Sequence, residues 1–136
     1  MTVYFDHHIV PSTDKARTAR FYAEILGLPA PREEGPFAAL DLGNDVALYV
    51  AGWEERVAPQ HYAFLVSEAE FDTFYRRLTE LGLPHWADPH RRLPQQVNHD
   101  DGGRGTYFHD PDGHFVEVLT VRYGGRPTSV APAAAA

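Results

Sequence analysis

The apolar positions of the chain follow two kinds of spacing, which alternate in the same order twice. Short apolar runs predict β-strands over residues 3–10, 37–42, 46–50 and 61–66. Apolar residues spaced three and four positions apart predict helices over residues 16–26 and 71–81. Each half of the chain therefore begins with a strand and continues with a helix.

Capping signals support both helices. Thr13 or Asp14 can cap the first helix, and Ser67 with Glu70 has the spacing of a capping box before the second. Gly27 ends the first helix, and a glycine also follows the second.

The two halves also share residues. Segments 21–29 and 74–84 both contain a Phe-Tyr pair followed by Leu-Gly-Leu-Pro. His7 precedes the glycine of the first segment by 20 residues, and His61 precedes that of the second by 21. A strand–helix–three-strand unit is therefore predicted to occur twice along the chain.

The second half closes with a hairpin that contains an unexpected charge. Residues 110–113, Asp-Pro-Asp-Gly, predict a tight turn between strands over residues 106–108 and 115–121. Glu117 lies within the second of these strands, among apolar residues, where an ionised carboxylate is costly to bury unless it is paired or bound to a metal. Glu117 therefore needs a partner.

Residues 85–98 predict a poor strand with a mobile loop, and residues 124–136 predict a disordered tail.

Composition narrows the classes of protein to consider. With 136 residues and 43% hydrophobic content, the chain is expected to form one domain, and its net charge of −7 disfavours nucleic acid as a partner. Neither a membrane span nor a signal peptide is evident, so a cytoplasmic protein is expected. Cysteine is absent, so a metal site would use histidines and carboxylates, which favours zinc, iron, manganese or nickel.

The repeat predicts such a metal site. If the two units pair about a pseudo-twofold axis, their first strands lie close together, and His7, His61 and Glu117 can converge as two imidazoles and one carboxylate. We prefer His7 to His8 because of its spacing, since His8 points to the opposite face of the strand. Taken singly, each histidine also fits a half-buried hydrogen-bonded residue, and Glu117 fits an outward-facing strand position.

The same residues resemble the vicinal oxygen chelate superfamily, which includes glyoxalase I, extradiol dioxygenases, fosfomycin-modifying enzymes and bleomycin-binding proteins. The resemblance implies an α+β fold in which two paired βαβββ modules form a curved mixed β-sheet, a half-barrel around a divalent metal. One domain would span residues 1–123, with modules at about 1–56 and 57–123. A homodimer is also implied, as are the ligands His7, His61 and Glu117. The matching residues are Asp6-His7, Pro11, Asp14, Phe21-Tyr22, Leu26-Gly27-Leu28, His61, the segment 107–114 and Glu117.

Within the superfamily, the extradiol dioxygenases are similar in the closing segment. They carry a histidine, a tyrosine, an Asp-Pro-x-Gly turn and a glutamate, which His99, Tyr107, residues 110–113 and Glu117 nearly reproduce. Thr106 replaces an apolar residue, and no histidine stands between His8 and His61, where the acid–base histidine is expected. His99 or Tyr107 would then move the proton during the reaction. The alternative to these catalytic roles is that His99 is only a loop residue and Tyr107 only an aromatic residue of the core.

Other members match less well. A glyoxalase-type site usually takes a fourth ligand from the last strand of the first unit, and residues 49–55 offer no clear match. Fosfomycin-modifying enzymes usually carry a threonine two residues after the first ligand, where this chain has Ile9.

The sequence therefore predicts a divalent-metal-dependent enzyme acting on a small oxygen-chelating substrate, with extradiol-dioxygenase-like or glyoxalase-like (isomerase or lyase) chemistry. Fe²⁺ is favoured, and Mn²⁺, Zn²⁺ and Ni²⁺ are the alternatives. The competing hypothesis is a metal-free protein of the bleomycin-resistance type, which binds a drug or metabolite.

Overall fold

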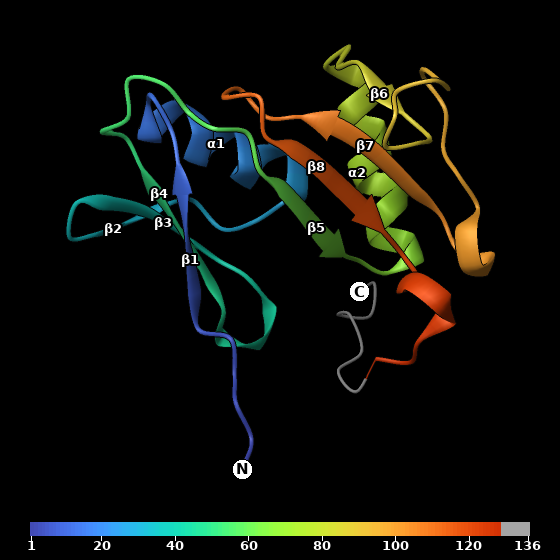
Figure 1. The fold of residues 1–136 in the computed structure, drawn as a ribbon, viewed down its shortest axis with the longest axis horizontal. Coiled ribbons are helices and arrows are strands. Elements are labelled where there is room, and N and C mark those ends of the chain that lie inside the picture. The colour runs from blue at the N-terminus through green and yellow to red at the C-terminus, as the bar shows by residue number, and fades with distance from the viewer. Residues whose placement is uncertain (129–136) are drawn as a thin grey trace. The chain divides into compact units, whose positions relative to one another are not determined.

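The computed structural model describes residues 1–128, which form two units. Unit 1 comprises residues 1–59 and 110–113, and unit 2 comprises the other described residues, 60–109 and 114–128. Each unit contains one four-stranded mixed sheet and one α-helix (Figure 1). The predicted α+β fold with two βαβββ repeats is confirmed.

Unit 1 has the strand order β1-β4-β3-β2, with β1 parallel to β4 and the other neighbours antiparallel. The helix α1 joins β1 to the three-stranded meander. The elements are β1 (His7–Pro11), α1 (Lys15–Leu26), β2 (Arg32–Glu34), β3 (Phe37–Asp41), the 3₁₀ turn η1 (Gly43–Asp45) and β4 (Ala47–Ala51).

Unit 2 repeats this topology as β5-β8-β7-β6, with β5 parallel to β8. A long loop separates the short strand β6 from β7. The elements are β5 (His61–Leu65), α2 (Glu68–Glu80), β6 (His85–Trp86), the 3₁₀ turn η2 (Asp100–Gly102), β7 (Gly105–His109), β8 (Phe115–Leu119) and the 3₁₀ turn η3 (Tyr123–Gly125).

The helix ends form as their capping residues predict. Asp14 caps α1 by accepting a hydrogen bond from the backbone N–H of Arg17, and Gly27 follows it with φ of 67°, a left-handed conformation that glycine adopts without strain. Ser67 and Glu70 form both hydrogen bonds of a capping box at the start of α2.

Each sheet buries one face beneath its helix. Because neighbouring residues of a strand point to opposite faces, alternate positions pack against the helix and the positions between them line the other face. His7 and His61 lie on that other face of their units. The largest buried core side chains are Val10, Tyr22, Ile25, Leu40 and Val50 in unit 1, and Phe71, Leu78, Phe108 and Val116 in unit 2.

Several segments differ from their predictions. The first strand begins only at His7, and β2 was not predicted, because its three residues are all exposed. Residues 85–98 supply only the two-residue strand β6. Residues 129–136 of the predicted tail lie outside the described residues, whereas residues 123–125 form η3. No helix within residues 1–128 is long and apolar enough to cross a bilayer.

Candidate metal centre

His61 begins β5 and presents one ring nitrogen for coordination. Its Nδ1 lies 3.0 Å from the main-chain oxygen of Phe115, and its Nε2 lies 3.2 Å from Oε1 of Glu117. A carbonyl oxygen only accepts hydrogen bonds, so Nδ1 carries a proton, and a neutral ring then has its lone pair on Nε2. This tautomer is the one that binds a metal through Nε2.

Glu117 lies in the middle of β8 and is only 2% exposed. Its Oε1 accepts a hydrogen bond of 2.5 Å from the hydroxyl group of Tyr123. A neutral His61 cannot donate to the same oxygen, because its Nε2 is an acceptor. Two acceptors at 3.2 Å are favourable only with a cation between them, either a second proton on the imidazole or a metal ion. The buried carboxylate therefore has Tyr123 and His61 as its partners.

Tyr107 lies directly opposite Glu117 in the β7–β8 ladder. Its hydroxyl oxygen is 3.5 Å from that of Tyr123. Burial, the hydrogen bond with Tyr123 and the negative charge of Glu117 together raise the pKa of Tyr107 well above its ordinary value. Tyr107 is therefore held as a neutral phenol, which can donate a hydrogen bond but does not act as a base at neutral pH.

His7 begins β1 and has a comparable hydrogen bond. Its Nδ1 lies 2.7 Å from Oδ2 of Asp6, a carboxylate that accepts a hydrogen bond from Nδ1–H, so that a neutral ring has its lone pair on Nε2. The ring of His7 stacks on Tyr49 with 4.7 Å between ring centroids. Tyr49 is opposite Ile9 in the β1–β4 ladder, as Glu117 is opposite Ala63 in β5–β8, so Tyr49 takes the position in unit 1 that Glu117 takes in unit 2.

The structure gathers some of the predicted site residues. His61, Glu117 and Tyr107 come together in unit 2, whereas His7 belongs to unit 1. His99 is exposed directly before η2, and its catalytic role stays a prediction. Within residues 1–128, no three histidine or acidic side chains are grouped to hold a metal ion together. The convergence of His7 with His61 and Glu117 therefore stays a prediction.

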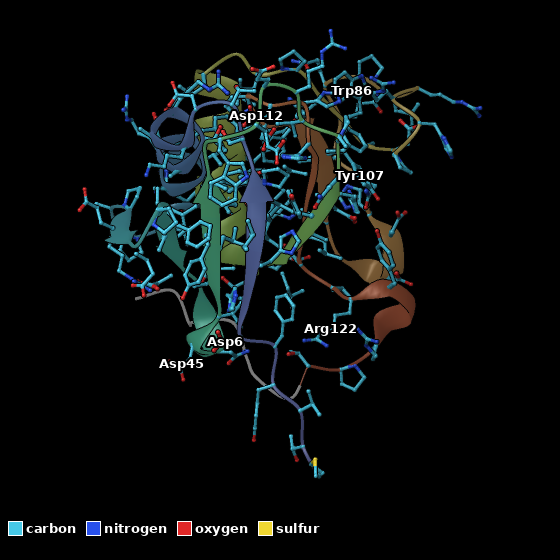
Figure 2. All side chains as sticks on the ribbon, turned by 60° about the vertical axis from the view of Figure 1, so that its left-hand side comes forward. Asp6, Asp45, Trp86, Tyr107, Asp112 and Arg122 are labelled. Carbon is cyan, nitrogen blue, oxygen red and sulfur yellow. The ribbon has the colours of Figure 1, made fainter. Side chains whose placement is uncertain are left out.

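Aromatic rings surround each of the two histidines. Trp86 and Tyr107 extend from the neighbouring strands β6 and β7 of unit 2 (Figure 2). The unit 2 cluster consists of His61, Trp86, Tyr107, His109 and Phe115, with ring centroids 5.0–6.4 Å apart. The unit 1 cluster runs from His7 through Tyr49 and Phe37 to Trp53, with centroids 4.7–5.6 Å apart. Such rings suit a planar, apolar ligand.

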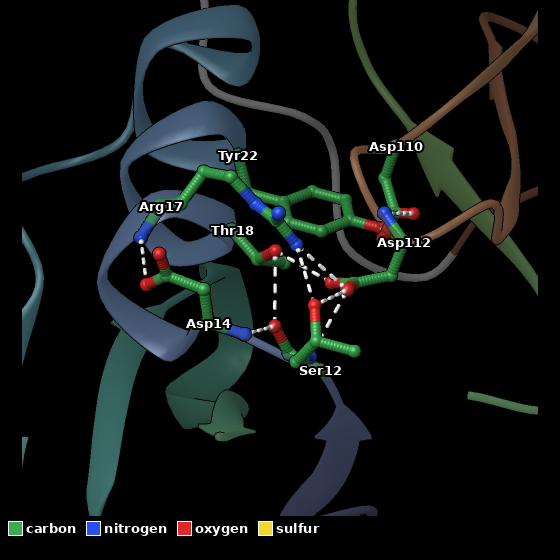
Figure 3. A network of polar contacts seen from close by, with 8 residues as sticks. Ser12, Asp14, Arg17, Thr18, Tyr22, Asp110 and Asp112 are labelled. Atoms are coloured by element: carbon green, nitrogen blue, oxygen red, sulfur yellow. Dashed lines mark hydrogen bonds and ion pairs between the residues drawn. The ribbon is translucent and has the colours of Figure 1, made fainter. Parts of the chain in front are cut away.

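The turn that precedes β8 is fixed by a buried carboxylate of unit 1 (Figure 3). The side chain of Asp112 is 1% exposed and accepts hydrogen bonds from the N–H and hydroxyl of Thr13, from Arg17 and from the hydroxyl of Thr18. Burial alone would raise the pKa of Asp112, but the hydrogen bonds from Thr18 and Thr13 outweigh it and lower the pKa to about 2. The neighbouring Asp110 accepts a hydrogen bond of 2.7 Å from Tyr22.

Comparison with known proteins places this chain in a family. The model of the Glyoxalase/Bleomycin resistance protein/Dioxygenase superfamily matches residues 4–118. The chain belongs to this superfamily. The resemblance noted in the sequence is thereby confirmed, and the superfamily fold agrees with the two βαβββ units.

Individual superfamily members are similar over most of the chain. The solved structure of "Oxidase ChaP-H1" is 52% identical with a TM-score of 0.88, and the match covers 91% of this chain and 100% of that protein. "Glutathione transferase FosA" of Serratia marcescens is 30% identical, covering 83% of this chain and 77% of that protein. "Metallothiol transferase FosB" of Shouchella clausii (strain KSM-K16) is 38% identical over 86 residues, which are 63% of this chain and 52% of that protein.

All three relatives have the names of enzymes, which supports an enzyme of the metal-dependent type within this superfamily. These names differ in reaction, so they leave the chemistry open.

Sequence reasoning missed two residues that contact the candidate ligands, Asp6 and Tyr123. Asp6 was visible as the acid next to His7. Tyr123 was visible only as an aromatic residue in front of two glycines, at the edge of the predicted tail.

Proposed function

We propose that the chain is a divalent-metal-dependent oxidoreductase that uses molecular oxygen and acts on a small planar molecule with vicinal oxygens. The metal ligands of this proposal are His7, His61 and Glu117, with Fe²⁺ as the favoured ion and Mn²⁺, Zn²⁺ or Ni²⁺ as alternatives. Two imidazoles with one carboxylate are typical of non-haem iron sites that keep open positions for other ligands.

The observation that carries the proposal is the pair formed by His61 Nε2 and Glu117 Oε1. His61 Nε2, which is an acceptor in the neutral ring, faces a buried carboxylate oxygen at 3.2 Å. A metal cation satisfies both atoms at once. The Nδ1–H of His7 likewise donates a hydrogen bond, to Asp6, which directs the lone pair of a neutral ring to Nε2. In both histidines Nδ1 faces an oxygen acceptor, which is the arrangement that this metal site requires.

The bound metal would supply Lewis-acid stabilisation of negative charge on substrate oxygens. The chain's own groups perform the remaining tasks. The rings of Trp86 and Phe115 in unit 2 offer flat surfaces for a planar substrate. Tyr107, held as a phenol, can donate a proton but not take one up, so in this proposal Tyr107 would act only as a donor and His99 would accept the proton that must move.

Oxygen chemistry ranks ahead of isomerase or lyase chemistry because of one relative. "Oxidase ChaP-H1" is 52% identical to this chain over 91% of its length. Its name supports an oxidation, which agrees with the similarity of the closing segment to that of extradiol dioxygenases.

Elemental analysis tests the metal site. We expect about one divalent ion per chain in wild type after reconstitution at neutral pH, and little in His61→Ala. His90→Ala, which removes an exposed histidine from the loop after β6, is the matched control and should retain metal. Wild type without bound metal would end the enzyme proposal and favour the metal-free drug- or metabolite-binding alternative.

Oxygen consumption then tests the reaction. With Fe²⁺ reconstituted under anaerobic conditions, the protein should consume oxygen when simple catechols are added. Turnover that does not respond to Fe²⁺ but is supported by Ni²⁺ or Zn²⁺, without oxygen uptake, would favour isomerase or lyase chemistry.

A thiol transferase acting on fosfomycin is the second candidate, favoured by the names of the two curated relatives. The position two residues after His7 is Ile9, an exposed apolar side chain in place of the expected threonine. Loss of free thiol on incubation with fosfomycin, Mn²⁺ and glutathione or cysteine would establish this activity, and we expect none.

We also propose that the protein is a homodimer, as the superfamily resemblance implies. Size-exclusion chromatography with light scattering checks this, with an expected mass of about twice the 15.2 kDa of one chain.

A further inference from the structure

We propose that Tyr123 is a positioning residue of the metal centre, whose hydroxyl group holds the Glu117 carboxylate in the orientation that faces His61. This inference rests on the proposed function, since it concerns the affinity of Glu117 for a divalent cation. All of the residues involved belong to unit 2.

The contacts of one oxygen atom carry the inference. Oε1 of Glu117 accepts a hydrogen bond from the Tyr123 hydroxyl at 2.5 Å and faces Nε2 of His61 at 3.2 Å. A carboxylate oxygen has two lone pairs, so it can accept from the phenol with one and bind a cation with the other. Hydrogen bonds to a ligand carboxylate fix its orientation and influence how tightly it binds the metal.

The backbone after β8 directs Tyr123 toward Glu117. Tyr123 begins η3, and the next two residues, Gly124 and Gly125, have φ of 74° and 68°. These left-handed conformations suit glycine and turn the chain within three residues. The turn is closed by a hydrogen bond from the N–H of Gly125 to the carbonyl oxygen of Arg122. This turn fixes the backbone at Tyr123, its second residue, and the Tyr123 hydroxyl contacts Glu117 of β8.

Packing alone does not explain where Tyr123 lies. The residue is 64% exposed, so its ring contributes little to a core, while its hydroxyl contacts a carboxylate that is 2% exposed. The hydroxyl of Tyr107 lies 3.5 Å from that of Tyr123, and Tyr107 is opposite Glu117 in the sheet. Tyr107 can donate to Tyr123 while Tyr123 donates to Glu117. The two phenols thus form a short chain of hydrogen bonds that ends on the candidate ligand.

Titration with Co²⁺ alone tests this assignment, since the visible absorption of bound Co²⁺ reports both affinity and ligand geometry. Tyr123→Phe removes only the hydroxyl group. We expect its Co²⁺ affinity to fall by about tenfold or more, as is typical when an outer-shell partner is lost, with a changed absorption band. Tyr62→Phe is the matched control. Tyr62 is next to His61 in β5, and its hydroxyl donates to Gln60 rather than to Glu117, so this variant should match wild type.

A Tyr123→Phe protein with wild-type affinity and spectrum would overturn the inference and leave the metal site standing. Tighter Co²⁺ binding would also overturn it, because the hydroxyl would then compete with the cation. Should wild type bind no Co²⁺, the proposed function fails and the inference fails with it.

If Tyr123→Phe does not fold, as judged by circular dichroism, a second variant tests the positioning role of Tyr123. Gly124→Ala keeps the phenol and adds a methyl group that meets no atom within 4 Å, so its effect is backbone strain in the turn. Co²⁺ affinity reduced by a few-fold supports the positioning role, and unchanged affinity overturns it.

Discussion

The two units place a histidine at the same point of the same scaffold and surround it differently. His7 and His61 each begin the first strand of their unit, opposite the first residue of its last strand. Two residues further along that last strand, unit 1 has Tyr49 and unit 2 has Glu117. His7 stacks on the tyrosine ring, whereas His61 faces the carboxylate. The repeat thus preserves the positions of the imidazoles, and one side-chain difference decides which unit contributes a negative charge.

The two histidines also differ in what fixes their tautomer. His61 donates from Nδ1 to the main-chain oxygen of Phe115, which belongs to the sheet itself. His7 donates to the side chain of Asp6, which is 82% exposed and precedes β1. A backbone acceptor survives almost any substitution, but a side-chain acceptor can be removed. The histidine of unit 1 is therefore the more easily perturbed of the two.

Neutralising the carboxylate of unit 2 should have the largest effect. Glu117→Gln keeps the shape of the side chain and removes the charge that binds the cation, so we expect Co²⁺ affinity to fall by more than about 100-fold, beyond the usual cost of losing an outer-shell partner. Tyr49→Phe is the matched change in unit 1 and should alter affinity by less than about threefold. Equal losses in both variants would show that the two positions contribute alike.

The network of hydrogen bonds that Asp112 accepts in unit 1 should affect the stability of the fold and not metal binding. Asp112→Asn removes a buried charge that Thr13, Arg17 and Thr18 solvate. We expect the free energy of unfolding, measured with urea, to fall by about 2 kcal/mol. Asp45→Asn, at an exposed position with φ of 60°, should change it by less than about 0.5 kcal/mol. A similar change in both variants would contradict the structural role of the network.

The same carboxylate predicts a dependence on pH. Because the folded-state pKa of Asp112 is lowered to about 2, its contribution is fully present above the unfolded-state pKa of about 4 and is lost as pH falls toward 2. The stability difference between wild type and Asp112→Asn should therefore be constant from pH 5 to 7 and shrink by about 2 kcal/mol or less toward pH 2. If the stability difference between the two proteins stays constant down to pH 2, its cause would be packing and not the charge of Asp112.

Removing the side-chain acceptor of unit 1 should have the smallest effect. Asp6→Asn weakens the hydrogen bond that orients His7, and water can replace much of it because Asp6 is exposed. We expect Co²⁺ affinity to fall by about threefold, with Asp45→Asn as the neutral control. A loss as large as that of Glu117→Gln would mean that Asp6 itself binds the cation.

Local signals predicted most of the fold. Asp14, Gly27 and the Ser67–Glu70 capping box marked the helix ends correctly, because caps act within a few residues. Strand β2 escaped, because Arg32–Glu34 is entirely polar and exposed and forms a strand only through its pairing with β3. Strand β6 has only two residues, too few to show the alternation of apolar and polar positions that predicts a strand.

The candidate site was predicted only in part. His61 and Glu117 were identified from the repeat and from a charge in an apolar strand, and the structure brings them together. Tyr123 was missed because its contact with Glu117 depends on how the chain folds back after β8, which no local pattern reports. The role of Asp112 was missed because its partners lie 94–99 residues earlier in the chain, and no local pattern reports such a distance.

The turn at residues 110–113 has a consequence for biosynthesis. These residues are part of unit 1, although both strands that flank them belong to unit 2. A ribosome that has completed residues 1–59 has made the whole of α1 but not the carboxylate that Thr13 and Thr18 bind. Contacts of such long sequence separation form late and slowly. Unit 1 can therefore be completed only after almost all of unit 2 has been translated, and residues 1–59 expressed alone would lack part of their own structure.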